Sequence, residues 1–402
     1  MVQVLNLTAS RLDQSGIVST STPTRISVSH EIRDFAYCWP RTNQLGAARC
    51  YAFQCADILE LYCETVLPAR RAEPFFIAIF NKDDQPLALF PLSVERLNMT
   101  RILRFIDGGL SDLNAPVVFL PTREWDHGTV HLVWQNLRKI LPFDLAVFEK
   151  MPDRIGDLPN PLILLKTSKD NDSCHAMNLA SSWEHFSTKL PRRRTTLRFS
   201  RRLEERGRVM FEIAKTPEQY DLVIQSLMDQ KTRRYLETRG VDGLARSGYR
   251  SFLKTARRLL YPTGPVCLFA LKVDDTIIAT VWGYVVGSRF YYLMPSFEGG
   301  KWRAYSPGRI LVDKIVQWCI AHRLDVFDFG LGDEKYKLEY CDAQTALYRA
   351  EIPSTVRGRL YVLLYDVKAR LKIRMRLKQI KSLFVWMVRT SNRNEERRHR
   401  GD

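Results

Sequence analysis

Two adjoining stretches decide the fold of this chain: YSPGRILVDKIVQWCI at residues 305–320 and DVFDFGLGDEKYK at residues 325–337. In the first, Ser306 suits an N-cap, and Pro307 suits the first helical position, where a missing N–H group costs nothing. The apolar residues of this stretch recur at helical spacing: Ile310, Leu311, Ile315, Trp318 and Cys319. The sequence therefore predicts a helix whose apolar face lies on a sheet.

The second stretch is typical of a short strand over 325–329 followed by a loop over 330–337. The helix before it offers free N–H groups and a positive dipole end, which suit an anionic ligand. Strand and loop carry several chemically capable side chains to one sheet edge: Asp328, Glu334, Tyr336 and Lys337. We therefore predict a functional site at this edge.

The length and the charge distribution indicate how many domains the protein has and where its basic surfaces lie. At 402 residues the chain exceeds the usual size of a single core, so two domains are expected. Nearly all of the net charge of +17 comes from two segments, 189–208 and 351–402. The sequence therefore predicts two local basic surfaces and not a generally cationic protein.

Other sequence features indicate a cytoplasmic protein without a metal site. No apolar run approaches the length of a membrane span, and the N-terminus lacks the pattern of a secretory signal. The eight cysteines show no Cys-x-x-Cys pair, which favours reduced structural thiols over disulfides or zinc. The seven histidines show no metal-ligand spacing.

The order of elements predicts an α+β fold with a duplicated domain. We expect a flexible N-terminal arm at 1–29, a first domain at 30–165, a second at 170–355, and a basic amphipathic helix with a disordered tail at 356–402. The expected helices are 47–66, 125–140, 183–205 with a break at Pro191, 217–239 and 249–260, besides the one after Pro307. The expected strands are 26–28, 75–80, 87–92, 102–106, 117–120, 143–148, 209–213, 266–273, 276–286, 289–296 and 343–352.

The second half resembles the GNAT acyltransferase fold. Residues 305–308 and 327–337 resemble the CelD/BcsL group of GNAT proteins, which is associated with cellulose and exopolysaccharide synthesis. The resemblance covers roughly 183–347, and the first half fits the group more loosely through 91–92 and 112–114. The group is similar in turn to FemAB-type peptidyltransferases, which carry two GNAT-like domains in one chain. The resemblance thus implies two GNAT-like domains in tandem.

The resemblance implies acyl-CoA as the donor substrate. GNAT enzymes typically hold the coenzyme A pyrophosphate at the head of the central helix, which places Ser306, Gly308 and Arg309 in that role. The usual glycine-rich loop is reduced here to the single Gly308, and Pro307 removes one amide donor. Aminoacyl-tRNA, the donor of FemAB-type enzymes, therefore remains an alternative donor. The backbone of Met294 and Ser296 is the candidate donor to the oxyanion.

Four residues are candidates for catalytic roles, each with a structural alternative. Asp328 could be the general base or an acid that binds loop amides after Gly330. Glu334 could be the base instead or a surface acid. Tyr336 stands where many GNAT enzymes place the acid that protonates the leaving thiolate, or it packs as an aromatic. The lysine that corresponds to Lys337 in FemAB-type proteins contacts phosphate or the reacting carbonyl. Alternatively, Lys337 is a solvated surface lysine.

The two basic segments have candidate partners. Arg194, Arg198, Arg201 and Arg202 lie at three- and four-residue spacings and could hold phosphates, including those of tRNA; pairing with Glu204 and Glu205 is the alternative. The tail has an apolar stripe and could lie on an anionic membrane at its inner face, or pack on the core.

We predict an acyltransferase that acts on an amine or hydroxyl of a polysaccharide or cell-envelope precursor, a small molecule or a lipid-linked saccharide. A FemAB-type aminoacyl-tRNA-dependent transferase and a non-catalytic accessory protein of polysaccharide export are the alternatives.

Overall fold

The computed structural model describes residues 2–7, 22–119, 125–179, 182–246 and 248–365. The α-helices are α1 (Ala56–Arg70), α2 (His127–Ile140), α3 (Trp183–Ser187), α4 (Arg193–Glu204), α5 (Pro217–Arg239), α6 (Tyr249–Thr255), α7 (Pro307–Ala321) and α8 (Lys335–Tyr340). The strands of the first half are β1 (Gln3–Asn6), β2 (Arg25–Ser29), β3 (Ala48–Arg49), β4 (Ala72–Phe80), β5 (Pro86–Leu97), β6 (Thr100–Phe105), β7 (Val117–Phe119), β8 (Leu145–Pro152), β9 (Arg154–Ile155) and β10 (Leu158–Pro159). Those that follow are β11 (Ser168–Asn178), β12 (Val209–Ile213), β13 (Val266–Val273), β14 (Thr276–Val286), β15 (Arg289–Phe297), β16 (Val326–Leu331) and β17 (Ala343–Pro353).

One sheet runs through both halves, in the order β1-β2-β4-β5-β6-β8-β17-β11-β16-β15-β14-β13-β12. Within each half a helix connects two strands that pair in parallel: α2 leads into β8 beside β6, and α7 leads into β16 beside β15. The last strand, β17, crosses back to pair with β8, while β11 pairs with β16 and β17. The halves are therefore joined through the sheet itself.

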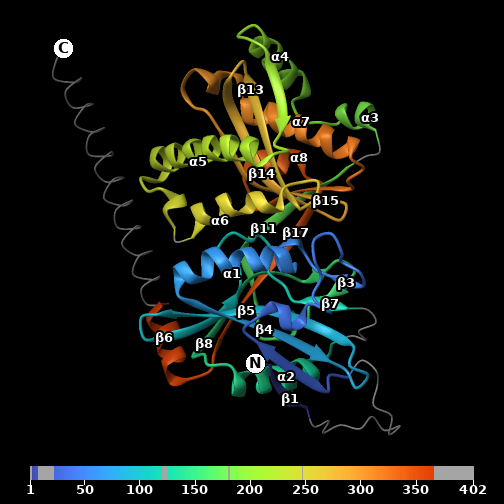
Figure 1. Cartoon of the computed structure of the whole chain (residues 1–402), viewed down its shortest axis with the longest axis vertical. Helices are drawn as coiled ribbons and strands as arrows, with labels where there is room; N and C mark the ends of the chain where they lie inside the picture. The colour runs from blue at the N-terminus through green and yellow to red at the C-terminus, as the bar shows by residue number, and fades with distance from the viewer. Residues whose placement is uncertain (1, 8–21, 120–124, 180–181, 247, 366–402) are drawn as a thin grey trace, which may run out of the picture.

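The helices form layers on either side of the sheet (Figure 1). Helix α1 of the first half lies against α6 of the second in the middle of the molecule, and α5 covers the same inner face. Helix α2 covers the outer face of the first half, whereas α7 and α4 lie on the outer face of the second. Each half thus repeats a helix–sheet–helix arrangement.

The inner helices share one hydrophobic core. The rings of Tyr62 on α1 and Phe252 on α6 have centroids 4.9 Å apart. The Tyr249 hydroxyl donates a hydrogen bond to the carbonyl of Gly108 at 2.8 Å. Gly248 has a φ of +85°, and a Cβ there would lie 2.6 Å from the carbonyl oxygen of Thr65. Only glycine allows so close an approach at this contact between the halves.

Most elements agree with the sequence expectations. The residues that begin and end these elements show the local signals on which such expectations depend. Helix α5 covers the predicted range 217–239: the Thr216 hydroxyl accepts a hydrogen bond from the Gln219 amide, Pro217 occupies the first turn, and Gly240 ends the helix at a φ of +70°. Helix α7 likewise starts at Pro307 as expected.

Four local expectations were wrong. The helix expected from residue 47 begins at Ala56, because Cys55 is extended. The gap expected between the two domains, 166–169, holds the start of β11. The loop expected over 330–337 contains the first turn of α8. The Ser306 side chain makes no cap hydrogen bond, since its backbone is left-handed with a φ of +50°.

The ends of the chain are only partly described. Strands β1 and β2 pair with each other, and β2 pairs with β4, so these parts of the expected flexible arm belong to the sheet. Residues 356–365 are helical, but the rest of the expected basic helix and tail, 366–402, lies outside the described residues. Among the described helices, none is long and apolar enough to cross a membrane.

Candidate functional site

A cavity opens where β15 and β16 part. Their parallel pairing ends at Tyr291 and Asp328, and β15 continues to Phe297 without β16 beside it. The resulting cavity, of about 410 Å³, is lined by β14, β15, the head of α7 and α8: Val281, Tyr292, Pro295, Ser296, Phe297, Arg303, Ser306, Pro307, Gly308, Arg309, Val312, Tyr336 and Tyr340. We call it the donor cavity. It contains four of the five residues predicted to bind the cofactor; the fifth, Met294, lies elsewhere.

The head of α7 presents polar groups to this cavity. The first turn of a helix has no intrahelical acceptors for its N–H groups. The Arg309 amide donates to the Ser306 carbonyl at 3.0 Å, and Pro307 has no N–H group, so the Gly308 amide is the donor left for a ligand. The left-handed backbone of Ser306 is a strained conformation of the kind that clusters at binding sites.

Arg309 adds a cationic group beside this amide. Its Nη2 donates to Glu339 at 2.9 Å, while the buried Nη1 has no hydrogen-bond partner among the described residues. Glu339 also accepts from Arg192 at the start of α4 at 2.8 Å. The pair of arginines on one carboxylate leaves positive charge at the cavity, which suits a phosphate.

Lys337 is buried and is not a solvated lysine. Its side chain is 6% exposed, its Nζ donates to the Leu331 carbonyl at 2.5 Å, and it pairs with Glu334 at 3.0 Å. Glu334 is largely exposed. Helix α8 therefore fixes the Lys337 ammonium against the end of β16.

Asp328 lies on the face of β16 opposite to Phe327 and Phe329, as its position in the strand predicts. Its Oδ2 accepts from Arg289 Nη1 at 2.8 Å and its Oδ1 accepts from the Gly330 amide at 2.8 Å. Both carboxylate oxygens of Asp328 thus have hydrogen-bond partners. This arrangement is the one expected if Asp328 is an acid that binds loop amides and not the general base. An apo arrangement does not exclude a catalytic role, which stays a prediction.

Tyr336 faces the donor cavity from α8 and is hydrogen-bonded to Tyr292. Burial raises the pKa of the Tyr336 hydroxyl, and the charge of Glu334 raises it further. The hydroxyl therefore stays protonated at neutral pH and can donate a proton to a leaving group.

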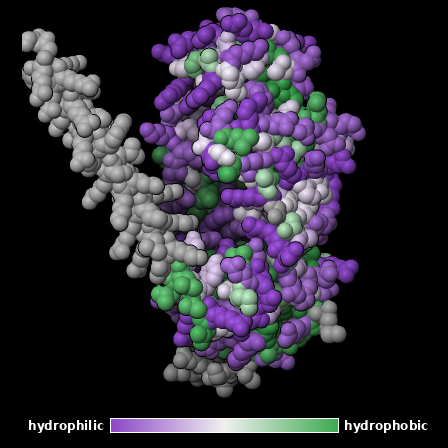
Figure 2. Space-filling view, turned by 90° about the vertical axis from the view of Figure 1, so that its left-hand side faces the viewer, coloured by the Kyte–Doolittle hydropathy of each residue, from purple (hydrophilic) through white to green (hydrophobic). Residues whose placement is uncertain are grey.

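A second cavity lies between the halves, on the opposite face of β15. It has a volume of about 170 Å³ and is lined by residues of both halves: Gly109, Leu110, Asp112, Lys231, Tyr235, Arg239, Gly243, Arg246, Tyr249, Trp282, Leu293 and Met294. We call it the inter-half cavity. The face in Figure 2 is hollowed between the upper and lower halves. Met294 lines this cavity and not the donor cavity.

Asp112 reaches from the first half to the end of β16. Its carboxylate lies beside Gly330 and Leu331: a Cβ on Gly330 would lie 1.9 Å from its Oδ2, and the Leu331 amide lowers the pKa of the carboxyl. The Leu331 carbonyl accepts from Lys337, so Asp112 and Lys337 both lie at the end of β16. Burial raises the pKa of Asp112 to about 6, partly offset by the charge of Lys150.

Lys231 of α5 faces the same cavity. Burial lowers the pKa of its ammonium to about 8, and the charge of Arg239 lowers it further. The charge of Glu334 raises the pKa of Lys231, and the charge of Lys337 lowers it. An ammonium with a lowered pKa and a carboxyl with a raised pKa therefore line one cavity, which is a feature of functional sites.

The predicted phosphate-binding arginines all lie exposed on α4: Arg194, Arg198, Arg201 and Arg202. In the described part of the chain none of the four forms an ion pair, and the Arg202 guanidinium lies over the Tyr305 ring at 5.4 Å. The alternative to phosphate binding was that these arginines pair with Glu204 and Glu205, and these ion pairs are not observed among the described residues. Helix α4 packs on α7 and on the turn before it, but none of the four arginines lines the donor cavity.

No group of three or more His, Cys, Asp or Glu residues that could hold a metal ion occurs in the described part of the chain. The expected absence of a metal stays a prediction, as do the roles given to the individual site residues.

Comparison with known proteins agrees with this geometry. Residues 191–338, less than half of the chain, match the family described as acetyltransferase (GNAT) domain. The second half therefore carries a GNAT-type domain, and the α+β fold with two GNAT-like halves is confirmed. No curated protein matches the sequence.

Solved structures share the fold over about four fifths of the chain. The crystal structure of FemX is similar with a TM-score of 0.53 and 12% identity, over 78% of this chain and 94% of that one. A conserved protein of unknown function from Bacteroides thetaiotaomicron VPI-5482 has a TM-score of 0.51 and 11% identity, over 81% of this chain and 97% of that one. At such identity the likeness shows the fold alone. The finer resemblance to CelD/BcsL stays a prediction.

Sequence reasoning missed Asp112 and Lys231 as site residues. In the sequence, Asp112 stands out only through the looser resemblance of the first half, and Lys231 is one basic residue of a long helix. No local pattern marks either residue, because the cavity that they share exists only where the two halves meet.

Proposed function

We propose that the protein is an acyltransferase that takes its donor from the outer face of β15 and its acceptor from the inner face. One observation carries this proposal: the donor cavity and the inter-half cavity lie on opposite faces of β15, where β15 and β16 part. The charge of Asp112 in the second cavity reaches Tyr336 in the first. Two substrates bound in this way would meet at the parting of the strands.

Acyl-CoA is the donor that the donor cavity fits best. Its phosphates would lie at the Gly308 amide and Arg309, where the helix N-terminus favours negative charge. Its pantetheine arm would follow the edge of β15 that β16 leaves unpaired. Met294 and Ser296 pair with Trp282 and Thr280 of β14, and their role as oxyanion donors stays a prediction.

The acyl transfer then needs a base, an acid and a fixed positive charge. Asp112 would take the proton from the acceptor amine or hydroxyl, whose nitrogen or oxygen forms a bond to the acyl carbon. Lys337 would stabilise the oxyanion, the C–S bond would break, and Tyr336 would give its proton to the thiolate. Asp328 would hold Arg289 and Gly330 in position, and Glu334 would hold Lys337.

The acceptor would carry an anionic group near its nucleophile. Lys231, Arg239 and Arg246 surround the inter-half cavity, with Asp112 as its carboxylate. A sugar phosphate or a lipid-linked saccharide pyrophosphate of a polysaccharide or envelope precursor meets this requirement.

A thermal-shift panel with a matched pair of variants tests the donor. Acyl-CoA at 100 times its Kd should stabilise the protein by about 2.7 kcal/mol. Gly308 is the second residue of α7, and Gly128 is the second residue of α2. Gly308→Pro removes the free amide at the donor cavity and should abolish the stabilisation, whereas Gly128→Pro makes the same change in the other half and should preserve it.

Aminoacyl-tRNA is the second candidate donor, and the unpaired arginines of α4 favour it. Stabilisation by charged tRNA with none by any acyl-CoA would reject the acyl-CoA proposal and support a FemAB-type transferase. Stabilisation by neither donor, in a protein that is folded by circular dichroism, would support the non-catalytic accessory protein.

A further inference from the structure

The helical segment 356–365 leaves an apolar face uncovered. Val356, Leu360, Leu363 and Leu364 follow the i, i+4, i+7, i+8 spacing of one helix face and are 79%, 54%, 61% and 51% exposed. Figure 2 shows a hydrophobic patch where the described chain ends. Single exposed apolar residues are ordinary on a protein surface, but a contiguous set marks an interaction site.

The opposite face of this segment is fixed to the first half. Tyr361 and Val362 pack against a small cluster formed by Ile102, Leu145 and Val147. The amides of Ser354 and Thr355 donate to the Asp144 carbonyl at 2.8 and 3.2 Å. Gly358 lies so close to β8 that a Cβ would be 2.0 Å from the same carbonyl oxygen. The segment therefore has one orientation, in which the leucines point away from the protein.

Basic residues surround the apolar face. Arg357 and Arg359 are exposed on the segment itself, and Arg101, Arg138 and Lys139 line the adjoining surface groove. Asp144 pairs with Arg101, but no ion pair of Arg357, Arg359 or Lys139 occurs among the described residues. The surface is therefore both apolar and cationic.

We propose that this surface, the tail-helix surface, docks on a bilayer that contains anionic lipids. Leucines at the acyl boundary and arginines at the headgroups are the arrangement by which an amphipathic helix binds a membrane interface. Charge favours this occupant over a second copy of the chain. A two-fold dimer would bring the same basic residues together from both copies, and like charges in contact oppose association.

Vesicle sedimentation with the full chain tests the proposal. The wild-type protein should bind vesicles of phosphatidylcholine and phosphatidylglycerol, bind pure phosphatidylcholine vesicles weakly, and lose affinity as salt is raised. Glutamate at Leu360, Leu363 and Leu364 together should weaken binding by at least about tenfold. A triple glutamate control at Leu222, Leu236 and Val241, which are exposed in the second half, should bind as the wild type does.

Three outcomes would overturn the proposal. The first is a wild-type protein that binds neither vesicle. The second is an equal loss of binding in both triple variants, which would assign the effect to net charge alone. The third is self-association in sedimentation equilibrium that the Leu360, Leu363 and Leu364 variant abolishes without any vesicle binding, which would make the surface a dimer interface. Circular dichroism and thermal unfolding of both variants establish that they are folded.

Discussion

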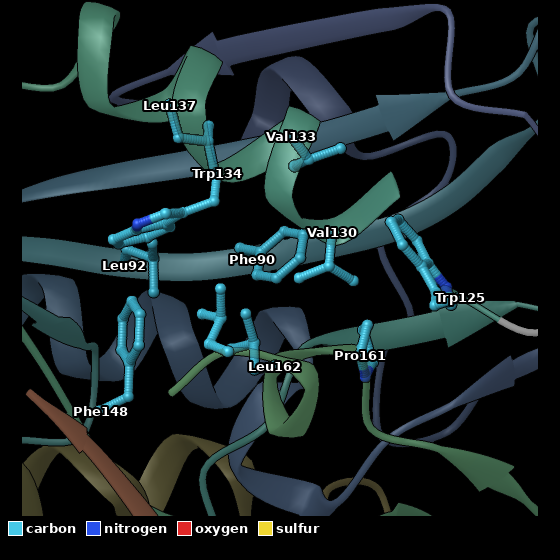
Figure 3. A pocket seen from close by; sticks show the side chains of 11 residues that line it. Phe90, Leu92, Trp125, Val130, Val133, Trp134, Leu137, Phe148, Pro161 and Leu162 are labelled. Atoms are coloured by element: carbon cyan, nitrogen blue, oxygen red, sulfur yellow. The ribbon is translucent and has the colours of Figure 1, made fainter. Parts of the chain in front are cut away.

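The two halves of the chain share an order of elements but use the same space differently. In the first half, α2 packs over β5 and β8, and aromatic and aliphatic side chains fill the region beneath it, leaving about 10 Å³ (Figure 3). Trp134 and Leu137 of α2 point onto Leu92 and Phe148 from the strands below. In the second half, the corresponding region beside α7 is a cavity of about 410 Å³.

The segment after the parallel strand accounts for part of this difference. In the first half a short 3-10 helix, Pro161–Leu164, brings Leu162 into the region under α2. In the second half α8 follows β16 and presents Tyr336 and Tyr340 at the cavity wall. The fold alone therefore does not make a binding site; the volumes of a few side chains decide whether a ligand has room.

The first half instead contributes to the site of the second. Asp112 and Gly109 belong to the loop after β6 and line the inter-half cavity together with α5. The second half thus leaves the donor cavity open, whereas the first half fills the corresponding region and supplies part of the lining of the inter-half cavity. The following predictions test this division of roles.

The largest effect is expected from Trp134→Ala in the filled half. Removal of a buried tryptophan typically costs about 3–5 kcal/mol in the free energy of unfolding, because a void replaces its contacts. The stabilisation by acyl-CoA should be unchanged in the variant at a temperature where it is folded. Denaturant unfolding measures the first quantity and thermal shift the second. A variant that loses acyl-CoA binding while its stability is unchanged would contradict the comparison.

Asp112→Asn should lower turnover by about 100-fold to 10,000-fold, the usual contribution of a general base. The wild-type rate should rise with pH through about 6, the raised pKa of Asp112, and the variant should lack this limb. A carboxyl whose pKa is higher in the folded state stabilises the protein below its unfolded pKa, and that stability is lost as pH rises through the folded pKa. Unfolding free energy should therefore fall between pH 4 and 6 in the wild type, and less so in the variant.

Asp328→Asn is the matched comparison for Asp112→Asn. Because Asp328 pairs with Arg289, its variant should lose stability, while turnover per folded molecule should fall less than in Asp112→Asn. Should Asp328→Asn abolish turnover and Asp112→Asn leave it intact, Asp328 is the base and the inter-half assignment is wrong.

Lys337→Met should reduce turnover by about 100-fold, the effect of losing one electrostatic contact to a developing oxyanion. Glu334→Gln keeps the ammonium and removes its partner, so its effect should be smaller. Steady-state kinetics with each purified variant gives both values. Wild-type turnover in Lys337→Met would exclude this lysine from the reaction.

The smallest effect is expected on α4. Alanine at Arg198, Arg201 and Arg202 together should weaken donor affinity by about tenfold and reduce its salt dependence, because exposed charge–phosphate contacts are screened. Alanine at Arg33, Arg96 and Arg323, which are also exposed, removes the same charge elsewhere and should have no effect. Equal losses in the two variants would show a general charge effect and not a binding surface.

The sequence by itself determined several elements of the second half. The apolar patterns predicted α7 after Pro307, α5 over 217–239, and the strands β13 and β14, because these signals depend on neighbouring residues. The same local signals placed Gly308 and Arg309 at a helix N-terminus, and so the donor cavity could be anticipated.

Only the tertiary structure decided the rest. Strand β17 crosses to β8, Asp112 meets the Leu331 amide, and Lys231 faces the inter-half cavity, although these partners are distant in sequence. Likewise, nothing local distinguishes a region that Trp134 fills from one that stays open. Periodicity records which face of an element is apolar; it does not record which other element covers that face or how much volume remains between them.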